Sequence, residues 1–272
     1  MKLPDFIYIG TGKAGTTWLF KVLSQHPQVF ITPVKETNFF DLNYQRGLNW
    51  YGEFFDSAPD QNVVGEISHR YIHNAETADR IAADVPNAKI VIGYREPVDY
   101  CVSDYLYAKR NGRFSGTLEQ WCNDRFDWST IKYHDMLLPF LERFGRDRIH
   151  IYDFARIKSE PESLINEITN FLGVRPIDPT EVDLTQRVNV ASAARNVTVT
   201  KYINIASKFL KRRGGQKLIA AVKSNRLVQT ALFRRLPDKP KPDSGIIDMI
   251  LGVAYEQIEK TDEAMGTSLL AN

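Results

Sequence analysis

The sequence predicts an α/β fold built on a doubly wound parallel sheet. Two observations support this fold. Short apolar runs alternate with segments of helical periodicity through the first 172 residues, and strands that alternate with helices form parallel sheets. A glycine-rich loop follows the first apolar run and leads directly into the first helical segment. After Gly173 the pattern changes and predicts a helical C-terminal extension.

The predicted strands and helices follow one another along the chain. Five apolar runs are typical of buried strands, and they lie at residues 6–9, 29–31, 63–67, 89–94 and 148–152. Helical spacing of apolar residues predicts helices over residues 16–26, 74–85, 97–110, 130–144 and 161–172. Asn74 can cap the second helix, Pro97 can occupy the first turn of the third, and Gly173 can end the fifth.

The remaining residues form the predicted extension. We expect a loop over 174–197, basic helices over 198–235, a charged proline-rich linker over 237–242 and an amphipathic helix over 245–265. The chain is therefore divided into an α/β core at 1–197 and a helical extension at 198–272, packed together as one structural domain. The basic residues within 201–235 could attract an acidic glycan, an acidic carrier protein or a membrane surface, and a solvated helix face is the alternative.

Composition limits the classes of function. Hydrophobic residues make up 43% of the chain and charged residues 25%, as in ordinary globular proteins. The formal net charge of +2 creates no global field that would attract nucleic acid. The two cysteines, Cys101 and Cys122, favour a reducing compartment. No apolar run approaches the roughly 20 residues that a membrane helix needs. We therefore expect a cytoplasmic protein without a transmembrane segment or a nucleic-acid partner.

The loop between the first strand and the first helix is the strongest local signal. Its sequence is Gly10-Thr11-Gly12-Lys13-Ala14-Gly15-Thr16-Thr17-Trp18. Backbone N–H groups and the positive end of a helix dipole hold anions at such a position. A nucleotide triphosphatase loop would have lysine where this chain has Thr16, and no predicted strand ends in an acidic residue suited to Mg²⁺. The loop therefore predicts binding of a shorter 5′ anion.

This loop resembles the 5′-phosphosulfate-binding loop of sulfotransferases that use 3′-phosphoadenosine 5′-phosphosulfate (PAPS), whose core is Lys-x-Gly-Thr-Thr-Trp. The resemblance implies that Lys13 lies by the bridging oxygen and neutralises charge on the leaving 3′,5′-adenosine diphosphate. It also implies that Trp18 lies against the adenine ring, with core packing as the alternative for this side chain. The cofactor-binding residues implied within the loop are Gly12, Lys13, Ala14, Gly15, Thr16, Thr17 and Trp18.

A second motif resembles the 3′-phosphate site of the same family, which is Arg-x-Pro-x(5)-Ser. This chain matches that spacing from Arg95 to Ser103. Arg95 follows the clearest predicted strand, and ligands bind at the carboxyl ends of strands in open α/β sheets. A guanidinium can hold phosphate through two parallel hydrogen bonds. We therefore expect Arg95 to lie beside the loop at 10–18. Arg187 and Arg195 resemble a late basic loop that closes over the nucleotide, and solvated loop charges are the alternative.

The first candidate for the general base follows the second predicted strand. The segment Lys35-Glu36-Thr37-Asn38-Phe39-Phe40 resembles the Lys-Glu-x-x-Phe-Phe segment of glycan-modifying sulfotransferases. The resemblance implies that Glu36 takes the acceptor proton and that Lys35 lies near the transferring sulfuryl oxygens. Phe39 could line the acceptor site, with ordinary core packing as the alternative. No spacing of histidine and cysteine suggests a metal site.

The second candidate base follows the third predicted strand. The segment Gly65-Glu66-Ile67-Ser68-His69-Arg70 resembles a Gly-Glu-Lys-Ser/Thr-Pro segment of the family. Ile67 stands where that pattern has lysine, and whether Arg70 replaces this cation stays open. Imidazole titrates near neutral pH, so His69 is a second candidate base, with a structural role as the alternative. We rank Glu36 before His69.

Together these resemblances imply PAPS-dependent transfer of a sulfuryl group to a hydroxyl or amine of a carbohydrate-like or small-molecule acceptor. The implied reaction is an in-line displacement with a general base and without a metal ion. Two alternatives stay open at this point. One is a P-loop kinase acting on a small molecule, against which Thr16 argues, and the other is an inactive nucleotide-binding module, which Ile67 favours. The acceptor, the choice between O- and N-sulfation and the oligomeric state are also open.

Overall fold

The computed structural model describes residues 1–59, 63–184, 192–194, 233–235 and 239–269. They group into two compact units. Unit one draws its residues from 1–96, 128–188 and 252–272, and unit two from 97–127 and 189–251. The division at residue 197 that the sequence suggests stays a prediction. In the described part of the chain, no helix is both long and apolar enough to cross a membrane.

Unit one contains a five-stranded sheet in the order β2-β3-β1-β4-β5. All neighbouring strands run parallel, so the predicted parallel sheet is confirmed. The strands are β1 at Phe6–Gly10, β2 at Val29–Ile31, β3 at Val63–Ile67, β4 at Lys89–Tyr94 and β5 at Ile149–Asp153. β1 lies in the middle because the chain first builds β2 and β3 on one side of it and then β4 and β5 on the other.

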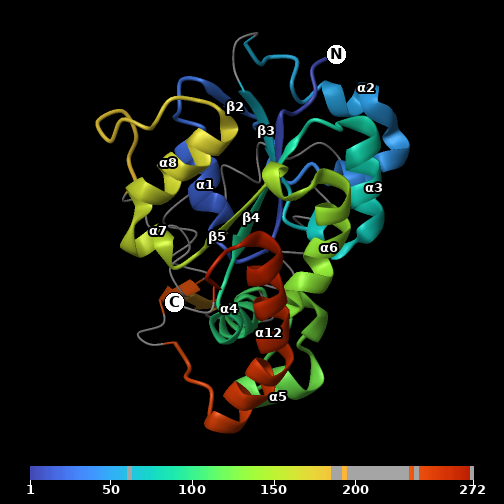
Figure 1. The fold of residues 1–272 in the computed structure, drawn as a ribbon. Coiled ribbons are helices and arrows are strands. Elements are labelled where there is room, and N and C mark those ends of the chain that lie inside the picture. Colours follow the sequence, from blue (N-terminus) through green and yellow to red (C-terminus); the bar gives the residue numbers. More distant parts are fainter. Residues whose placement is uncertain (60–62, 185–191, 195–232, 236–238, 270–272) are drawn as a thin grey trace. The chain divides into compact units, whose positions relative to one another are not determined.

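Helices of unit one cover both faces of this sheet, as a doubly wound fold requires (Figure 1). On one face lie α1 (Thr16–Leu23) and α8 (Pro161–Leu172), and on the other lie α3 (Ala75–Asp84) and α6 (Tyr133–Phe144). The short helices of this unit are α2 (Gly47–Gly52) and α7 (Arg156–Ser159), with a π-helical turn at Phe39–Asn43. The predicted cap of α3 is confirmed, because the Asn74 side chain accepts a hydrogen bond from Glu76 N at 3.1 Å.

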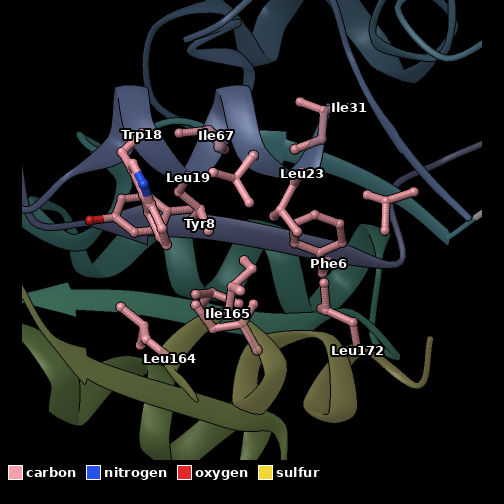
Figure 2. Close-up of a cluster of buried hydrophobic side chains, with 14 of the residues drawn as sticks. Phe6, Tyr8, Trp18, Leu19, Leu23, Ile31, Ile67, Leu164, Ile165 and Leu172 are labelled. Carbon is pink, nitrogen blue, oxygen red and sulfur yellow. The ribbon is translucent and has the colours of Figure 1, made fainter. Parts of the chain in front are cut away.

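An apolar core between the sheet, α1 and α8 holds β1 and α1, the two elements that flank the loop after β1 (Figure 2). Helical spacing places Trp18, Leu19, Val22 and Leu23 on one buried face of α1. Burial of one such side chain contributes about 2 kcal/mol. The helix ends at Leu23, three residues earlier than predicted, because Gln25 and His26 form i→i−3 hydrogen bonds ahead of Pro27. Packing of α1 therefore holds its first turn at the edge of the sheet.

Unit two contains α4 (Pro97–Arg110), α5 (Leu118–Asp124) and a two-stranded antiparallel ladder between β6 (Ser192–Ala194) and β7 (Phe233–Arg235). The predicted loop over 174–197 and the predicted helix over 198–235 are wrong at these two segments. Their backbone groups pair across a separation in sequence that local periodicity cannot detect. Residues 195–232 of the predicted basic helices lie outside the described residues. Helix α12 (Ser244–Met265) confirms the last predicted helix.

Candidate functional site

The predicted site residues of unit one follow four neighbouring strands at the point where each strand ends. The loop from Gly10 follows β1, Lys35 and Glu36 follow β2, His69 follows β3, and Arg95 follows β4. Parallel strands have their carboxyl ends at one edge of the sheet, and ligands of such sheets bind where the strand order reverses. That reversal occurs at β1, between β3 and β4. The strand order therefore brings these segments together.

Buried hydroxyl groups hold the loop after β1 against the sheet. Thr11 bonds to Gly93 O through both its backbone N, at 2.9 Å, and its Oγ1, at 3.0 Å. The Tyr8 hydroxyl donates to Thr11 O and the Tyr152 hydroxyl donates to Ala14 O, each at 2.8 Å. These carbonyl oxygens carry partial negative charge that would repel an anion. Because donors beneath the loop bind them, the loop is better suited to hold an anion.

Gly15 makes the turn from the loop into α1. Its φ is +83°, in the left-handed region that favours glycine, and a Cβ atom there would overlap the Ile157 side chain. The Gly15 carbonyl accepts the first helical hydrogen bond from Leu19 N at 3.0 Å. Thr16 and Thr17 are then the first residues of α1, where the helix dipole is positive. The predicted phosphate loop therefore has the strand–turn–helix geometry that anion binding needs.

Two of the three predicted catalytic residues have strained backbones. Lys13 has φ of +64° and Glu36 has φ of +63°. A non-glycine residue in this region costs roughly 1–3 kcal/mol, and such residues concentrate at functional sites. The conformation of Glu36 also interrupts the alternation of side chains that an extended strand imposes. The adjacent side chains of Lys35 and Glu36 can both reach residues around the loop.

Lys35 reaches the first turn of α1. Its Nζ atom lies 2.9 Å from Thr16 Oγ1 and 3.2 Å from Thr17 Oγ1. Burial lowers the pKa of the Lys35 ammonium, and the neighbouring Glu36 carboxylate partly opposes this effect. A half-buried cation therefore lies on the two hydroxyls that the resemblance assigns to the 5′-phosphate.

Glu36 and His69 form a hydrogen-bonded pair beside the loop. The distance between Glu36 Oε1 and His69 Nδ1 is 3.1 Å. The imidazole packs on the loop backbone, since a Cβ atom at Gly12 would lie 3.0 Å from His69 Cδ2. The side chains of His69 and Glu36 are 31% and 37% exposed. The two predicted bases therefore meet next to the predicted phosphate loop, and both are accessible to a ligand.

Arg95 lies against the same loop from the side of β4. Its Nη1 atom donates to Lys13 O at 2.6 Å, and its guanidinium carbon lies 4.4 Å from the centre of the Phe154 ring. The side chain is largely buried, with 6% of the residue exposed. The Tyr133 hydroxyl donates a hydrogen bond to the Arg95 carbonyl oxygen at 2.7 Å. The expected juxtaposition of Arg95 and the loop is present.

Three other predicted residues have different surroundings. Trp18 is 3% exposed and lies in the apolar core, with its Nε1 atom 3.2 Å from Leu184 O (Figure 2). Phe39 is fully buried and stacks on Tyr51, with ring centres 4.3 Å apart. Both positions fit the core-packing alternative. Arg70 is half exposed and its Nε atom pairs with Asp41 Oδ2 at 2.9 Å. The roles proposed for these residues in adenine or acceptor binding stay predictions.

Some predicted residues lie elsewhere in the chain. Ser103 is half-buried on α4 of unit two, where its predicted role in 3′-phosphate binding stays a prediction. Arg187 and Arg195 lie outside the described residues. Ile67, which stands where a lysine was expected, is fully buried in the core. A lysine at that position would therefore need different packing from the one observed.

Glu66 was not among the predicted site residues, yet it is the fully buried carboxylate next to them. Its Oε1 atom accepts hydrogen bonds from Thr37 Oγ1 at 2.5 Å, from Tyr71 OH at 2.8 Å and from Ser68 Oγ. Its Oε2 atom accepts one from Tyr51 OH. Burial raises the pKa of Glu66, and the hydroxyl donors oppose this shift. A single charge inside the otherwise apolar strand Val63–Ile67 was the available sequence signal.

One cavity of unit one lies away from these residues. It has a volume of about 470 Å³, and its lining includes residues at or just before the first residues of β1, β3 and β4, among them Pro4, Asp5 and Lys89. These are the amino ends of the strands, at the opposite edge of the sheet from the loop. No predicted site residue lines this cavity, so it has no part in the chemistry considered above.

Comparison with known proteins supports the resemblance to sulfotransferases along most of the chain. A family model described as "Sulfotransferase domain" matches residues 3–223. Membrane-associated sulfotransferase kil1 of Dictyostelium discoideum is 39% identical over 116 residues, which cover 40% of this chain and 25% of that protein. Heparan sulfate glucosamine 3-O-sulfotransferase 3A1 of Mus musculus is 28% identical over 192 residues, which cover 65% of this chain and 47% of that protein. The chain thus spans between a quarter and a half of these relatives.

A solved structure with a similar fold matches the chain from end to end. A sulfotransferase from Alicyclobacillus acidocaldarius has a TM-score of 0.70 and 19% identity, and the match covers 100% of this chain and 99% of that one. The likeness at this identity concerns the fold. The family model, in contrast, covers more than half of the sequence and includes the loop, the base-bearing segments and Arg95. The chain therefore belongs to the sulfotransferase domain family.

Proposed function

We propose that this protein transfers a sulfuryl group from PAPS to a hydroxyl or amine of an acceptor and releases 3′,5′-adenosine diphosphate. The observation that carries the proposal is the 2.6 Å hydrogen bond between Arg95 Nη1 and the carbonyl of Lys13 in the loop. It holds a guanidinium from the end of β4 against the loop that carries Lys13 at the end of β1. An adenine nucleotide with phosphate groups on both its 5′ and 3′ oxygens matches two such neighbouring anion sites.

The residues of unit one fit this donor at its 5′ end. Thr16 and Thr17 offer hydroxyls at the positive end of α1, and Lys35 adds a half-buried cation on the same hydroxyls. Lys13 lies inside the loop, where its charge would favour departure of the nucleotide. PAPS supplies the activated sulfuryl group. Arg95 would hold the 3′-phosphate through its planar guanidinium.

The proposed base is Glu36, with His69 as its hydrogen-bonded partner. A carboxylate oxygen of Glu36 would take the proton from the acceptor as the acceptor oxygen or nitrogen attacks sulfur. General-base catalysis of this kind contributes about 10²–10⁴-fold to rate. The 3.1 Å hydrogen bond to His69 would hold the carboxylate in one orientation. Its place beside the loop supports an attack in line with the leaving nucleotide.

The acceptor class is proposed to be carbohydrate-like or a small molecule. The Lys35-Glu36 segment resembles that of glycan-modifying enzymes, and one relative is named for heparan sulfate glucosamine. A reaction without a metal ion and a cytoplasmic location also stay predictions from the sequence. The proposed membrane or acidic-surface contact through residues 201–235 rests on residues outside the described ones, apart from Phe233–Arg235. One relative is named as membrane-associated.

Calorimetry tests the proposal without knowledge of the acceptor. In metal-free buffer we expect 3′,5′-adenosine diphosphate to bind roughly 10- to 100-fold more tightly than ADP, the range given by one charge-assisted phosphate contact. Equal affinity for the two nucleotides, or tighter binding of ADP, would overturn the proposal. A screen with labelled PAPS, in which desulfated glycans, phenols and amines are offered separately, would then identify the acceptor class.

A further inference from the structure

The carboxylate of Glu66 joins the two segments that carry the proposed base and its partner. Thr37 directly follows Glu36, and Ser68 directly precedes His69. The hydroxyls of Thr37 and Ser68 both donate to the same oxygen, Glu66 Oε1. Glu66 Oε1 is therefore bonded both to the residue that follows Glu36 and to the residue that precedes His69.

A second set of bonds ties Glu66 to the aromatic segment after β2. Tyr71 OH also donates to Oε1, and Tyr51 OH donates to Oε2. Burial raises the pKa of both tyrosines well above the ordinary value, so their hydroxyls remain protonated donors at neutral pH. The Glu36 backbone N donates to Ile67 O at 3.0 Å, which adds a direct bond between the two segments.

This arrangement is costly for the fold. A fully buried carboxyl group loses hydration, and its hydrogen-bond partners within the described residues are four hydroxyls rather than a cation. Hydrogen bonds to an ionised acceptor are, however, about twice as strong as neutral ones and are geometrically specific. The two that come from Thr37 and Ser68 fix these residues more closely than apolar packing would.

We propose that Glu66 is a positioning residue for sulfuryl transfer. By binding Thr37 and Ser68 through one oxygen, it keeps Glu36 and His69 within hydrogen-bond distance and aligned beside the loop. Glu66 itself does not touch donor or acceptor. The inference rests on the proposed function, because it assumes that Glu36 and His69 act on the acceptor proton.

The first test is Glu66→Gln, which keeps the shape of the side chain and removes its charge. A displacement of the base by about 1 Å can cost on the order of 100-fold in rate, so we expect a fall in kcat of that size. KM for PAPS and the affinity for 3′,5′-adenosine diphosphate should stay at the wild-type values, because the loop and Arg95 are not bonded to Glu66. A kcat equal to that of the wild type would overturn the inference.

Two further variants separate positioning from loss of stability. Ser68→Ala and Tyr51→Phe each remove one hydroxyl donor from the same carboxylate, but only Ser68 adjoins the proposed pair. We expect Ser68→Ala to lower kcat and Tyr51→Phe to leave it near wild type. The double variant with Glu66→Gln and Ser68→Ala should be no slower than Glu66→Gln alone, since residues acting as one unit are not additive. Equal losses of kcat in Ser68→Ala and Tyr51→Phe would indicate a merely structural network.

A spectroscopic measurement covers the case in which no acceptor has been found. The ring nitrogens of His69, observed by NMR in the 3′,5′-adenosine diphosphate complex, report the hydrogen bond at Nδ1. We expect this bond in the wild type and in Tyr51→Phe, and its loss in Glu66→Gln and Ser68→Ala. An intact bond in all four proteins would refute positioning by Glu66. Failure of the wild type to prefer 3′,5′-adenosine diphosphate would instead refute the proposed function.

Discussion

The imidazole of His69 and the carboxylate of Glu36 lie 3.1 Å apart, between Nδ1 and Oε1. The sequence presents these residues as competing candidates for one role, since each belongs to a different motif. Because they are bonded to each other, a change in either one alters the environment of the other. The remaining question is which atom takes the acceptor proton, and substitutions that keep or remove the Nδ1 hydrogen bond can answer it.

Glu36→Gln should lower kcat by about 10²–10⁴-fold, the usual contribution of a general base. Affinity for 3′,5′-adenosine diphosphate should be retained, because the nucleotide is held by other groups. His69→Asn can place an amide nitrogen near the position of Nδ1, whereas His69→Gln cannot. If His69 orients Glu36, His69→Asn keeps most of the rate and His69→Gln loses it.

Steady-state rates with saturating PAPS measure all three variants. The opposite assignment makes a distinct prediction: both histidine variants would then be as slow as expected for a missing base, while Glu36→Gln would keep a substantial rate. That pattern would make His69 the base.

Lys35→Met should weaken binding of 3′,5′-adenosine diphosphate by about 10-fold or more, which corresponds to loss of one charge-assisted hydrogen bond. In the wild type, affinity should fall as pH rises through the pKa of Lys35, because only the ammonium form attracts the anion. Burial has lowered this pKa, so the fall should begin below the range of an exposed lysine. Calorimetry across neutral to alkaline pH measures this effect.

The matched control for Lys35 is Lys21→Met, which removes an exposed lysine from α1, the helix whose first turn Lys35 contacts. This variant should keep the wild-type affinity and its pH dependence. If Lys35→Met shows the same alkaline fall in affinity as the wild type, another group is responsible for it.

Local sequence patterns predict the sheet and the place of the site well. The apolar runs at 29–31 and 63–67 match β2 and β3 residue by residue, because buried parallel strands are almost continuously apolar. Parallel strands then bring the loop, Glu36, His69 and Arg95 to one edge without any knowledge of side-chain packing. Motif spacing and strand topology together were sufficient for that part of the site.

Contacts between distant segments could not be predicted in the same way. The pairing of Arg70 with Asp41 and the burial of Trp18 depend on how segments pack after the sheet forms. The role of Glu66 needs four hydroxyls from three separate segments to converge on its carboxylate. The periodicity of the sequence does not predict such a convergence. The ladder between β6 and β7 joins segments about forty residues apart in the sequence, so local helical spacing misplaced its second strand.

Arg95→Gln should abolish the preference for 3′,5′-adenosine diphosphate over ADP. The guanidinium is held between Lys13 O and the Phe154 ring, and we expect it to bind the phosphate that ADP lacks. Affinity for 3′,5′-adenosine diphosphate should fall roughly 10- to 100-fold, while affinity for ADP should fall much less. Arg143→Gln, which changes an arginine paired with Asp79 on the surface, is the control and should bind both nucleotides as the wild type does. Equal losses for the two nucleotides would mean that Arg95 only supports the loop.

Trp18→Phe tests whether this side chain serves the core or the adenine ring. Trp18 is 3% exposed and its Nε1 atom bonds to Leu184 O. The smaller ring leaves a cavity and an unbonded carbonyl, so we expect the free energy of unfolding to fall by about 2 kcal/mol. Nucleotide affinity of the folded protein should change little. A large loss of affinity without loss of stability, measured by calorimetry and denaturant unfolding, would restore the adenine-stacking role.

The buried charge of Glu66 should also appear in the pH dependence of stability. Burial raises the pKa of Glu66 in the folded protein, whereas in the unfolded chain a glutamate titrates near about 4.3. Between these two values the folded state binds more protons than the unfolded state, so the free energy of unfolding falls as pH rises. Glu66→Gln has no proton to lose, and its stability relative to wild type should therefore increase from acid to neutral pH. Denaturant unfolding of both proteins at several pH values measures this difference. If the free energies of unfolding of the two proteins change with pH in parallel, the four hydroxyls fully offset the effect of burial and Glu66 is ionised at little cost.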